Sequence, residues 1–158
     1  DRVALGPLDL SALAQDLLDL YQPIAEDAGL ELTGEVEAGL VVTGHRQLLG
    51  QGLSNLIDNA IKYCPSGGRI VLSLAAVENG GARLSLSDSG PGIPPEHRER
   101  VLERFVRLDD SRGTPGSGLG LSLVAAVAKL HAVDLRLEDN DPGLRVVLEF
   151  PLRAASHE

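Results

Sequence analysis

The segment 51–63, QGLSNLIDNAIKY, constrains what this chain can be more than any other segment. Turned at 3.6 residues per turn, it separates into two faces. One face gathers Asn55, Asn59 and Lys62. The pattern predicts an amphipathic helix, from about residue 46 to residue 63, that packs on a core. The apolar face consists of Leu49, Leu53, Leu56, Ile57 and Ala60.

The residue types on the polar face favour a binding site. A solvated helix face usually carries Glu, Lys, Gln, Arg or Ala, whereas Asn is a poor helix former because its side chain competes for backbone hydrogen bonds. Asn55 and Asn59 place two amide oxygens one turn apart, and Lys62 adds an ammonium beyond them. Such oxygens suit Mg²⁺, and the ammonium suits a phosphate. The alternative is a merely solvated face, which is typical of most amphipathic helices.

Composition limits the possible classes of protein. The length of 158 residues, with 43% hydrophobic and 23% charged residues, predicts one globular domain with a substantial core. The net charge of −9 argues against a nucleic-acid partner, because a phosphate backbone needs a basic surface. Cys64 is the single cysteine, so no internal disulfide forms. The chain holds no Met and no apolar run of membrane-spanning length, and we expect it to be a fragment of a longer protein.

Periodicity predicts helices that alternate with strands. Ser11 is the expected cap of the first helix, and Tyr21 and Ile24 are expected on its buried face. A turn at residues 37–39 joins two of the strands. This order indicates an α+β, two-layer sandwich in which helices cover one face of a mixed, mostly antiparallel sheet. Helices are predicted at residues 11–27, 46–63, 95–105 and 119–130, and strands at 7–10, 30–36, 40–42, 70–77, 83–88, 133–138 and 144–150.

Asp88 is the second candidate feature of a site. Leu84, Leu86 and Asp88 share one face of their strand, and the two leucines mark that face as the core side. A carboxylate that points inward must be paired or hydrogen-bonded. The alternative is that Asp88 starts an Asx-turn before Gly90. The residues themselves support the two interpretations about equally.

The segment 116–121, GSGLGL, precedes or opens a helix. Glycines at a helix N-terminus offer free N–H groups and a favourable dipole to phosphate. The pattern is not a P-loop, because no Gly-Lys-Ser/Thr follows, and it is not a dinucleotide fingerprint, because its spacing is GxGxG and no strand precedes it. A flexible loop is the ordinary explanation for such a cluster.

Four segments, taken together, resemble the sensor histidine kinases of the GHKL ATP-binding superfamily. The segment 55–63, NLIDNAIKY, resembles their asparagine box, and 88–94, DSGPGIP, resembles their first glycine box. The segment 103–107, ERFVR, resembles the phenylalanine box, and 116–121 resembles the second glycine box. The order is that of the family, and the resemblance covers roughly residues 8–152. It implies the Bergerat fold for a single catalytic domain over residues 1–158.

The resemblance also implies a site for ATP and Mg²⁺. Asp88 would accept a hydrogen bond from the exocyclic amine of adenine, while Asn59 and Asn55 would hold the metal. Lys62 would reach the phosphates, and residues 106–115 would form a lid over them. Asn55, Asn59 and Lys62 are therefore the expected catalytic residues. The full expected ATP site is Asn55, Asn59, Lys62, Tyr63, Asp88, Gly90, Gly92, Ile93, Phe105, Arg107, Arg112, Gly116, Ser117, Gly118, Leu119, Gly120 and Leu121.

Three departures from the family pattern are visible. No histidine has the neighbours of a phosphoacceptor, so we expect His45, His97, His131 and His157 to be structural or solvated. His45 also follows Gly44 where the family often has Gly-Asp. The last hairpin carries Gly-Leu-Arg at residues 143–145 where Gly-Thr is common, which removes the expected hydroxyl contact to the purine. The dimerisation and phosphoacceptor helices are expected before Asp1.

The expected function is to present the γ-phosphate of Mg-ATP to a histidine on a separate helical domain of the same kinase. That kinase would be a homodimer that signals onward to a response regulator, and this domain would lie in the cytoplasm as part of a membrane-anchored sensor. One alternative is an ATP-hydrolysing conformational switch, but such relatives carry a Glu where Asn55 stands, and Asn cannot take a proton from water. The other alternative is a non-catalytic nucleotide-binding module.

Overall fold

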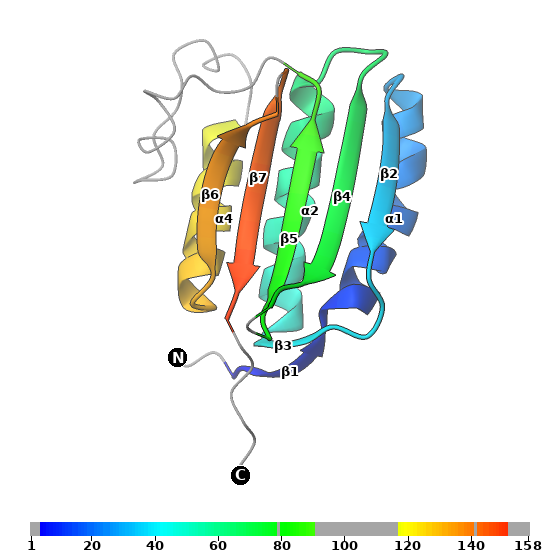
Figure 1. Cartoon of the computed structure of the whole chain (residues 1–158). Helices are drawn as coiled ribbons and strands as arrows, with labels where there is room; N and C mark the ends of the chain where they lie inside the picture. The colour runs from blue at the N-terminus through cyan, green and yellow to red at the C-terminus, as the bar shows by residue number, and fades with distance from the viewer. Residues whose placement is uncertain (1–3, 79, 91–116, 141, 152–158) are drawn as a thin grey trace.

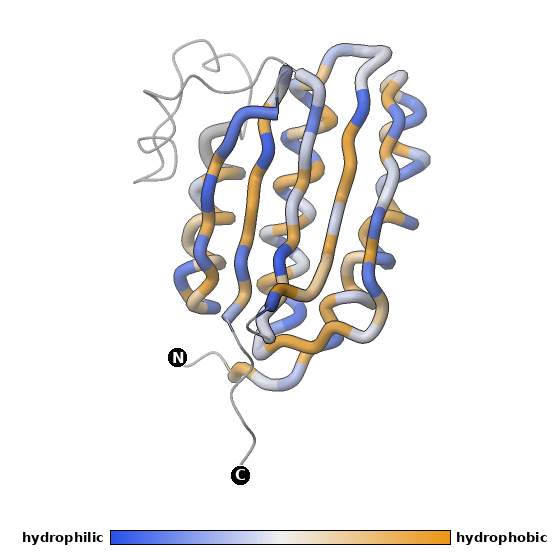
Figure 2. The backbone as a smooth tube through the Cα atoms, in the orientation of Figure 1, coloured by the Kyte–Doolittle hydropathy of each residue, from blue (hydrophilic) through white to orange (hydrophobic). Residues whose placement is uncertain are grey.

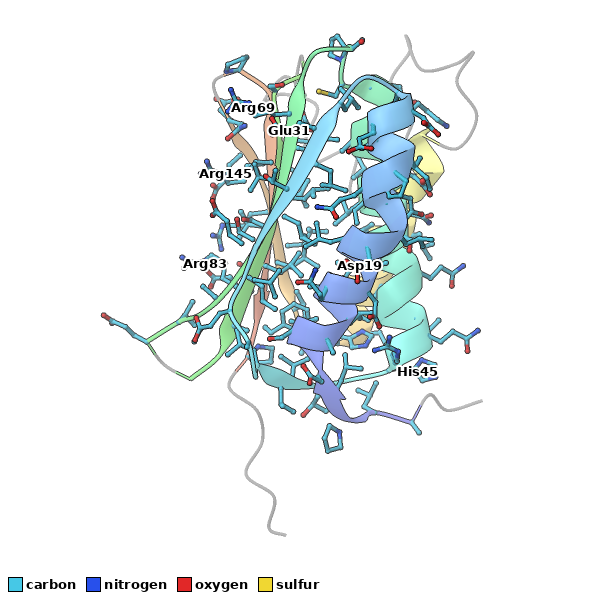
Figure 3. The ribbon with its side chains drawn as sticks, turned by 90° about the vertical axis from the view of Figure 1, so that its right-hand side faces the viewer. Asp19, Glu31, His45, Arg69, Arg83 and Arg145 are labelled. Atoms are coloured by element: carbon cyan, nitrogen blue, oxygen red, sulfur yellow. The ribbon has the colours of Figure 1, made fainter. Side chains whose placement is uncertain are left out.

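The structure is a computed structural model that describes residues 4–78, 80–90, 117–140 and 142–151, with the backbone alone for residues 117–120. The expected helix at 95–105 lies outside these residues. In the described residues a five-stranded sheet forms one layer and helices α1 (Leu10–Asp27), α2 (Arg46–Tyr63) and α4 (Ser117–Leu130) form the other, as expected (Figure 1). The side view shows the helices on one face of the sheet, while no described helix covers the other face (Figure 3).

The large sheet is mixed and mostly antiparallel, which confirms the predicted class. Its strand order is β2-β4-β5-β7-β6, in which β2 pairs with β4 in parallel and every other pair is antiparallel. Along the central strands, apolar residues that face the helices alternate with residues that face the opposite side, because helices cover only one face of this sheet. The strands are β2 (Glu31–Val36), β4 (Arg69–Ala76), β5 (Ala82–Asp88), β6 (Asp134–Asp139) and β7 (Leu144–Phe150).

A second, two-stranded sheet lies below the first in Figure 1 and consists of β1 (Gly6–Asp9) and β3 (Val41–Gly44). The turn expected at residues 37–39 does follow β2, but the strands it joins belong to different sheets. Ser11 fixes this turn, because its hydroxyl donates to the Glu37 carbonyl and accepts from the Leu40 N–H.

The start of α1 differs from the prediction. Asp9, not Ser11, is the N-cap: its Oδ1 accepts from the Ala12 N–H at 2.9 Å. Both residue types cap helices well, but the Ser11 hydroxyl is buried and already bonded to the 37–40 turn. Ile24 was expected on the buried face and is 44% exposed, because Ala25 takes the inward position and leaves Ile24 at the edge of the apolar stripe.

The core lies between the sheet and α2, whose apolar face is buried as predicted. Gly52 on α2 meets Val127 of α4, with 3.4 Å from the position of a Cβ to the valine methyl carbons. Glycine costs about 1 kcal/mol in the middle of a helix. The 3.4 Å distance, at the near limit of ordinary van der Waals contact, shows that α2 and α4 pack closely at this position. Figure 2 shows apolar segments along the central strands of the large sheet and along the helices behind them. Of the helices in the described residues, none is both long and apolar enough to cross a membrane.

Two histidines are structural, as the sequence predicted. His45 is the N-cap of α2, and its Nδ1 accepts from the Leu48 N–H at 3.2 Å. His131 is buried, and its Nε2 accepts from the His45 N–H at 3.0 Å. Because Nε2 accepts, Nδ1 carries the proton and donates to the Val127 carbonyl at 2.8 Å. His131 uses both ring nitrogens in these hydrogen bonds, so it has no free nitrogen for a phosphoryl group. His97 and His157 lie outside the described residues.

Candidate functional site

Three elements meet at the upper edge of the sandwich in Figure 1: the end of α2, the end of β5 and the turn between β6 and β7. Gly90 joins the first two, because a Cβ on it would lie 3.3 Å from Cys64 Cα and 3.4 Å from the Tyr63 carbonyl oxygen. The C-terminal end of α2, which follows Asn55 and Asn59, therefore meets the end of β5 at Asp88, although the two are separate in the sequence.

The polar face of α2 carries an unsatisfied amide. Asn55 and Asn59 are half-buried on this face, while Lys62 and Tyr63 are exposed. The Asn59 Nδ2 is buried and has no hydrogen-bond partner among the described residues. Such a group costs free energy unless something satisfies it. The amide can turn over so that Oδ1 takes this position, and an amide oxygen is a suitable ligand for Mg²⁺.

Asp88 ends β5 as a half-buried carboxylate. Burial raises the pKa of Asp88 above its ordinary value of 3.8, and the backbone N–H groups of Gly90 and Leu144 act in the opposite direction. Oδ1 accepts from the Gly90 N–H at 2.8 Å, which is the Asx-turn contact. Both interpretations of Asp88 are therefore correct at once. A carboxylate has about four acceptor sites, so two backbone donors leave capacity for a ligand amine.

The turn between β6 and β7 packs closely against the main chain of Asp88. Gly143 has φ +107°, and a Cβ on it would overlap the Asp88 carbonyl oxygen. Asn140 Nδ2 donates to that same oxygen at 2.9 Å. Sequence reasoning missed these contacts, because Asn140 lies 52 residues after Asp88 and no local pattern links the two residues.

Cys64 connects the end of α2 to the turn that follows Asp88. It is buried, and its Sγ lies 3.7 Å from Ser89 Oγ. Ser89 Oγ also accepts from the Arg69 N–H at 2.9 Å. Gly68 fits into this corner, where a Cβ would lie 2.8 Å from Ser89 Oγ. The helix end, the 65–68 turn and the Asp88 turn therefore pack as one unit.

The remaining expected site residues divide into two groups. Helix α4 begins at Ser117, so the second glycine segment opens a helix as predicted, with Gly118, Leu119 and Gly120 in its first turn. Leu121 is buried in the core. The expected lid at 106–115 lies outside the described residues. So do Gly92, Ile93, Phe105, Arg107, Arg112 and Gly116.

The chemistry of the donors limits what kind of metal this edge could hold. In the described part of the chain, no group of three His, Cys, Asp or Glu side chains could bind a metal ion. A divalent ion here would instead use amide oxygens together with phosphates of a bound nucleotide. Mg²⁺ binds in this way, because it keeps several waters and takes few protein ligands.

The two-layer sandwich, the polar helix face and the inward carboxylate together define an ATP-binding domain of the GHKL class. Residues 44–154 match the family described as "Histidine kinase-, DNA gyrase B-, and HSP90-like ATPase". That match covers more than half of the chain, and the chain belongs to this family.

Similar proteins are sensor histidine kinases. The chain is 48% identical over 105 residues to the signal transduction histidine-protein kinase/phosphatase MprB of Mycolicibacterium smegmatis, which covers 66% of this chain and 21% of that protein. A solved mycobacterial sensor histidine kinase MprB superposes with a TM-score of 0.78 at 33% identity, covering 96% of this chain and 100% of that one. Full-length ShkA in complex with AMPPNP superposes with a TM-score of 0.81 at 28% identity, covering 98% of this chain and 32% of that one.

The chain spans only part of the length of the curated relatives that it matches. It spans 21% of the length of the M. smegmatis protein and 33% of the sensor protein IrlS of Burkholderia pseudomallei. The solved catalytic domain of histidine kinase ThkA superposes with a TM-score of 0.83 at 25% identity, covering 95% of this chain and 97% of that one.

Proposed function

We propose that this chain is the catalytic domain of a sensor histidine kinase, which binds Mg-ATP at the edge formed by α2, β5 and the β6–β7 turn. The γ-phosphate of the bound ATP would be transferred to a histidine on a separate helical domain of the parent protein, and from there to a response regulator. The observation that carries the proposal is the buried Nδ2 of Asn59, which has no hydrogen-bond partner in the part of the chain that the structure describes. A polar group in that state favours a ligand that completes it. The complex of the similar protein ShkA with AMPPNP supports a nucleotide as that ligand.

Four residues of this edge have a role in the proposed function. Asp88 orients the nucleotide by accepting a hydrogen bond from the adenine amine. Asn55 and Asn59 would hold Mg²⁺, which when bound neutralises charge that develops on the transferring phosphoryl group. Lys62 is exposed near the end of the same helix face and would contact a phosphate. The protein's contribution is positioning and charge stabilisation, as phosphoryl transfer requires.

Asn55 distinguishes a kinase from an ATPase within this family. An amide cannot accept a proton from water, so Asn55 offers no general base for hydrolysis. The ATP bound here would then persist until an imidazole is docked in line with the γ-phosphate.

The test mixes this chain with the dimeric helical segment of its own parent protein and radiolabelled ATP. Acid-labile, base-stable phosphate should form on the segment, and Asn59→Ala should abolish it. Gln47→Ala is the control, because Gln47 is an exposed amide in the first turn of the same helix. Rapid ATP hydrolysis by this chain alone, without transfer to the segment, would favour a conformational ATPase instead.

A further inference from the structure

The main-chain oxygen of Asp88 lies just beyond the end of a strand ladder. Pairing between β5 and β7 stops at Ser87 and Arg145, one residue before Asp88. The Asn140 side chain supplies a donor there, since its Nδ2 donates to the Asp88 carbonyl at 2.9 Å. The Asn140 N–H donates to the Gly143 carbonyl at 3.0 Å and closes the β6–β7 turn. One residue therefore shapes this turn and bonds it to the end of β5.

Arg145 fixes the orientation of that side chain. Its Nη2 donates to Asn140 Oδ1 at 3.0 Å, and its Nε donates to Ser87 Oγ at 3.2 Å. An asparagine whose oxygen is held by a guanidinium must aim its NH₂ group the other way, which here is toward Asp88. Figure 3 shows Arg145 on the uncovered face of the sheet, the same face as Arg83. The contact chain thus runs from that open face to the strand end at the site.

We propose that Asn140 and Arg145 are a positioning pair that sets the Asp88 carboxylate for the adenine amine. The proposal rests on the proposed function, since it concerns the same site. The turn that the pair holds also gives Asp88 the Leu144 N–H and the close approach of Gly143. Hydrogen bonds of useful strength need heavy-atom distances near 2.7–3.2 Å, so a small shift of this turn weakens the contact to the amine.

The location of the pair distinguishes a role in positioning Asp88 from a role in the stability of the fold. From Ala82 to Ser87, β5 is already paired with β7, so the ladder holds the sheet without Asn140. The Asn140 bond is confined to the residue that reads the base. Loss of the pair should therefore change base discrimination more than it changes folding.

The experiment compares ATP with inosine triphosphate, which presents an oxygen where adenine has its amine. Calorimetry on the 158-residue chain measures the dissociation constant of each. In Asn140→Ala and Arg145→Leu, ATP affinity should fall about three- to tenfold, the loss expected for weakening one hydrogen bond, while affinity for inosine triphosphate stays unchanged. Arg145→Lys should give an intermediate loss, because an ammonium can bond Asn140 or Ser87 but lacks the guanidinium fork.

The matched control is Arg83→Leu. Arg83 lies on the same open face and pairs with Glu149 at 2.6 Å, far along the strands from Asp88. This variant should keep the wild-type preference for ATP. The double variant Asn140→Ala/Arg145→Leu should lose no more preference than Asn140→Ala alone, because the two residues act in series.

The outcomes distinguish this proposal from the one it rests on. Wild-type protein that binds both nucleotides equally, or neither, would refute the Asp88–adenine contact itself. A wild-type preference for ATP that survives in both variants would overturn the positioning pair alone. An equal loss for both nucleotides would also overturn it, since that result indicates a structural role. Thermal denaturation of each variant confirms that the comparison is between folded proteins.

Discussion

Replacing Gly143 with alanine tests how tightly the β6–β7 turn is held against Asp88. Two separate costs arise at this position. Gly143 has φ +107°, a conformation that costs an L-residue about 1–2 kcal/mol. The new Cβ would also overlap the Asp88 carbonyl oxygen and lie 2.7 Å from its carbon and 3.0 Å from Ser89 Cα. Because these are backbone atoms, no side-chain rotation relieves the overlap, which adds about 1–3 kcal/mol.

Gly39→Ala is the matched control. Gly39 also has a positive φ, +80°, but a Cβ there would meet nothing within 4 Å. Its cost is therefore the backbone term alone, about 1–2 kcal/mol, against about 2–5 kcal/mol for Gly143→Ala. The difference between the two variants isolates the overlap with Asp88.

Two assays report the result. Urea denaturation of the nucleotide-free chain gives the free energy of unfolding, and calorimetry gives the affinity for ATP. Gly143→Ala should be the less stable variant and should bind ATP more weakly, because Asp88 must move to admit the methyl group. Gly39→Ala should bind ATP like the wild type. If the two variants prove equally stable and bind ATP equally well, the turn does not press on Asp88 and the reasoning is refuted.

Three further predictions concern single side chains. Asp88→Asn should weaken ATP binding at least tenfold in calorimetry, since it removes a bond to a charged acceptor. The same variant should not lose stability at neutral pH, because the raised pKa of Asp88 means that folding disfavours the charged carboxylate. The stability of the wild type should therefore fall as pH rises from 3.8 through the folded-state pKa of Asp88. Denaturation of the variant at a series of pH values should lack this fall. Asn59→Ala should abolish the Mg²⁺ dependence of ATP affinity while still melting cooperatively; superimposable Mg²⁺ titrations would contradict this. Tyr21→Phe removes the 3.1 Å bond from the Tyr21 hydroxyl to Asp58 between α1 and α2, and should cost about 0.5–1.5 kcal/mol in urea denaturation without changing ATP affinity.

Local sequence patterns predicted most of the helices and strands that the structure describes. The 3.6-residue repeat placed α2 within the bounds that the structure has, and the alternation of Leu84 and Leu86 placed β5 with its buried side correctly. Such signals are reliable because a helix or strand must turn its apolar side toward a core wherever that core lies. The helix bounds failed where two good caps competed, at Asp9 and Ser11, since a distant turn decided between them.

The site divides in the same way. The sequence by itself predicts Asn55, Asn59 and Asp88 as site residues, because residue types that are costly in a helix face or at an inward strand position stand out without any structure. Only the tertiary structure brought in Asn140, Gly143 and the backbone N–H of Leu144. Their roles depend on β7 lying beside β5, and contacts between residues more than fifty positions apart follow from strand order and register, which no local pattern contains.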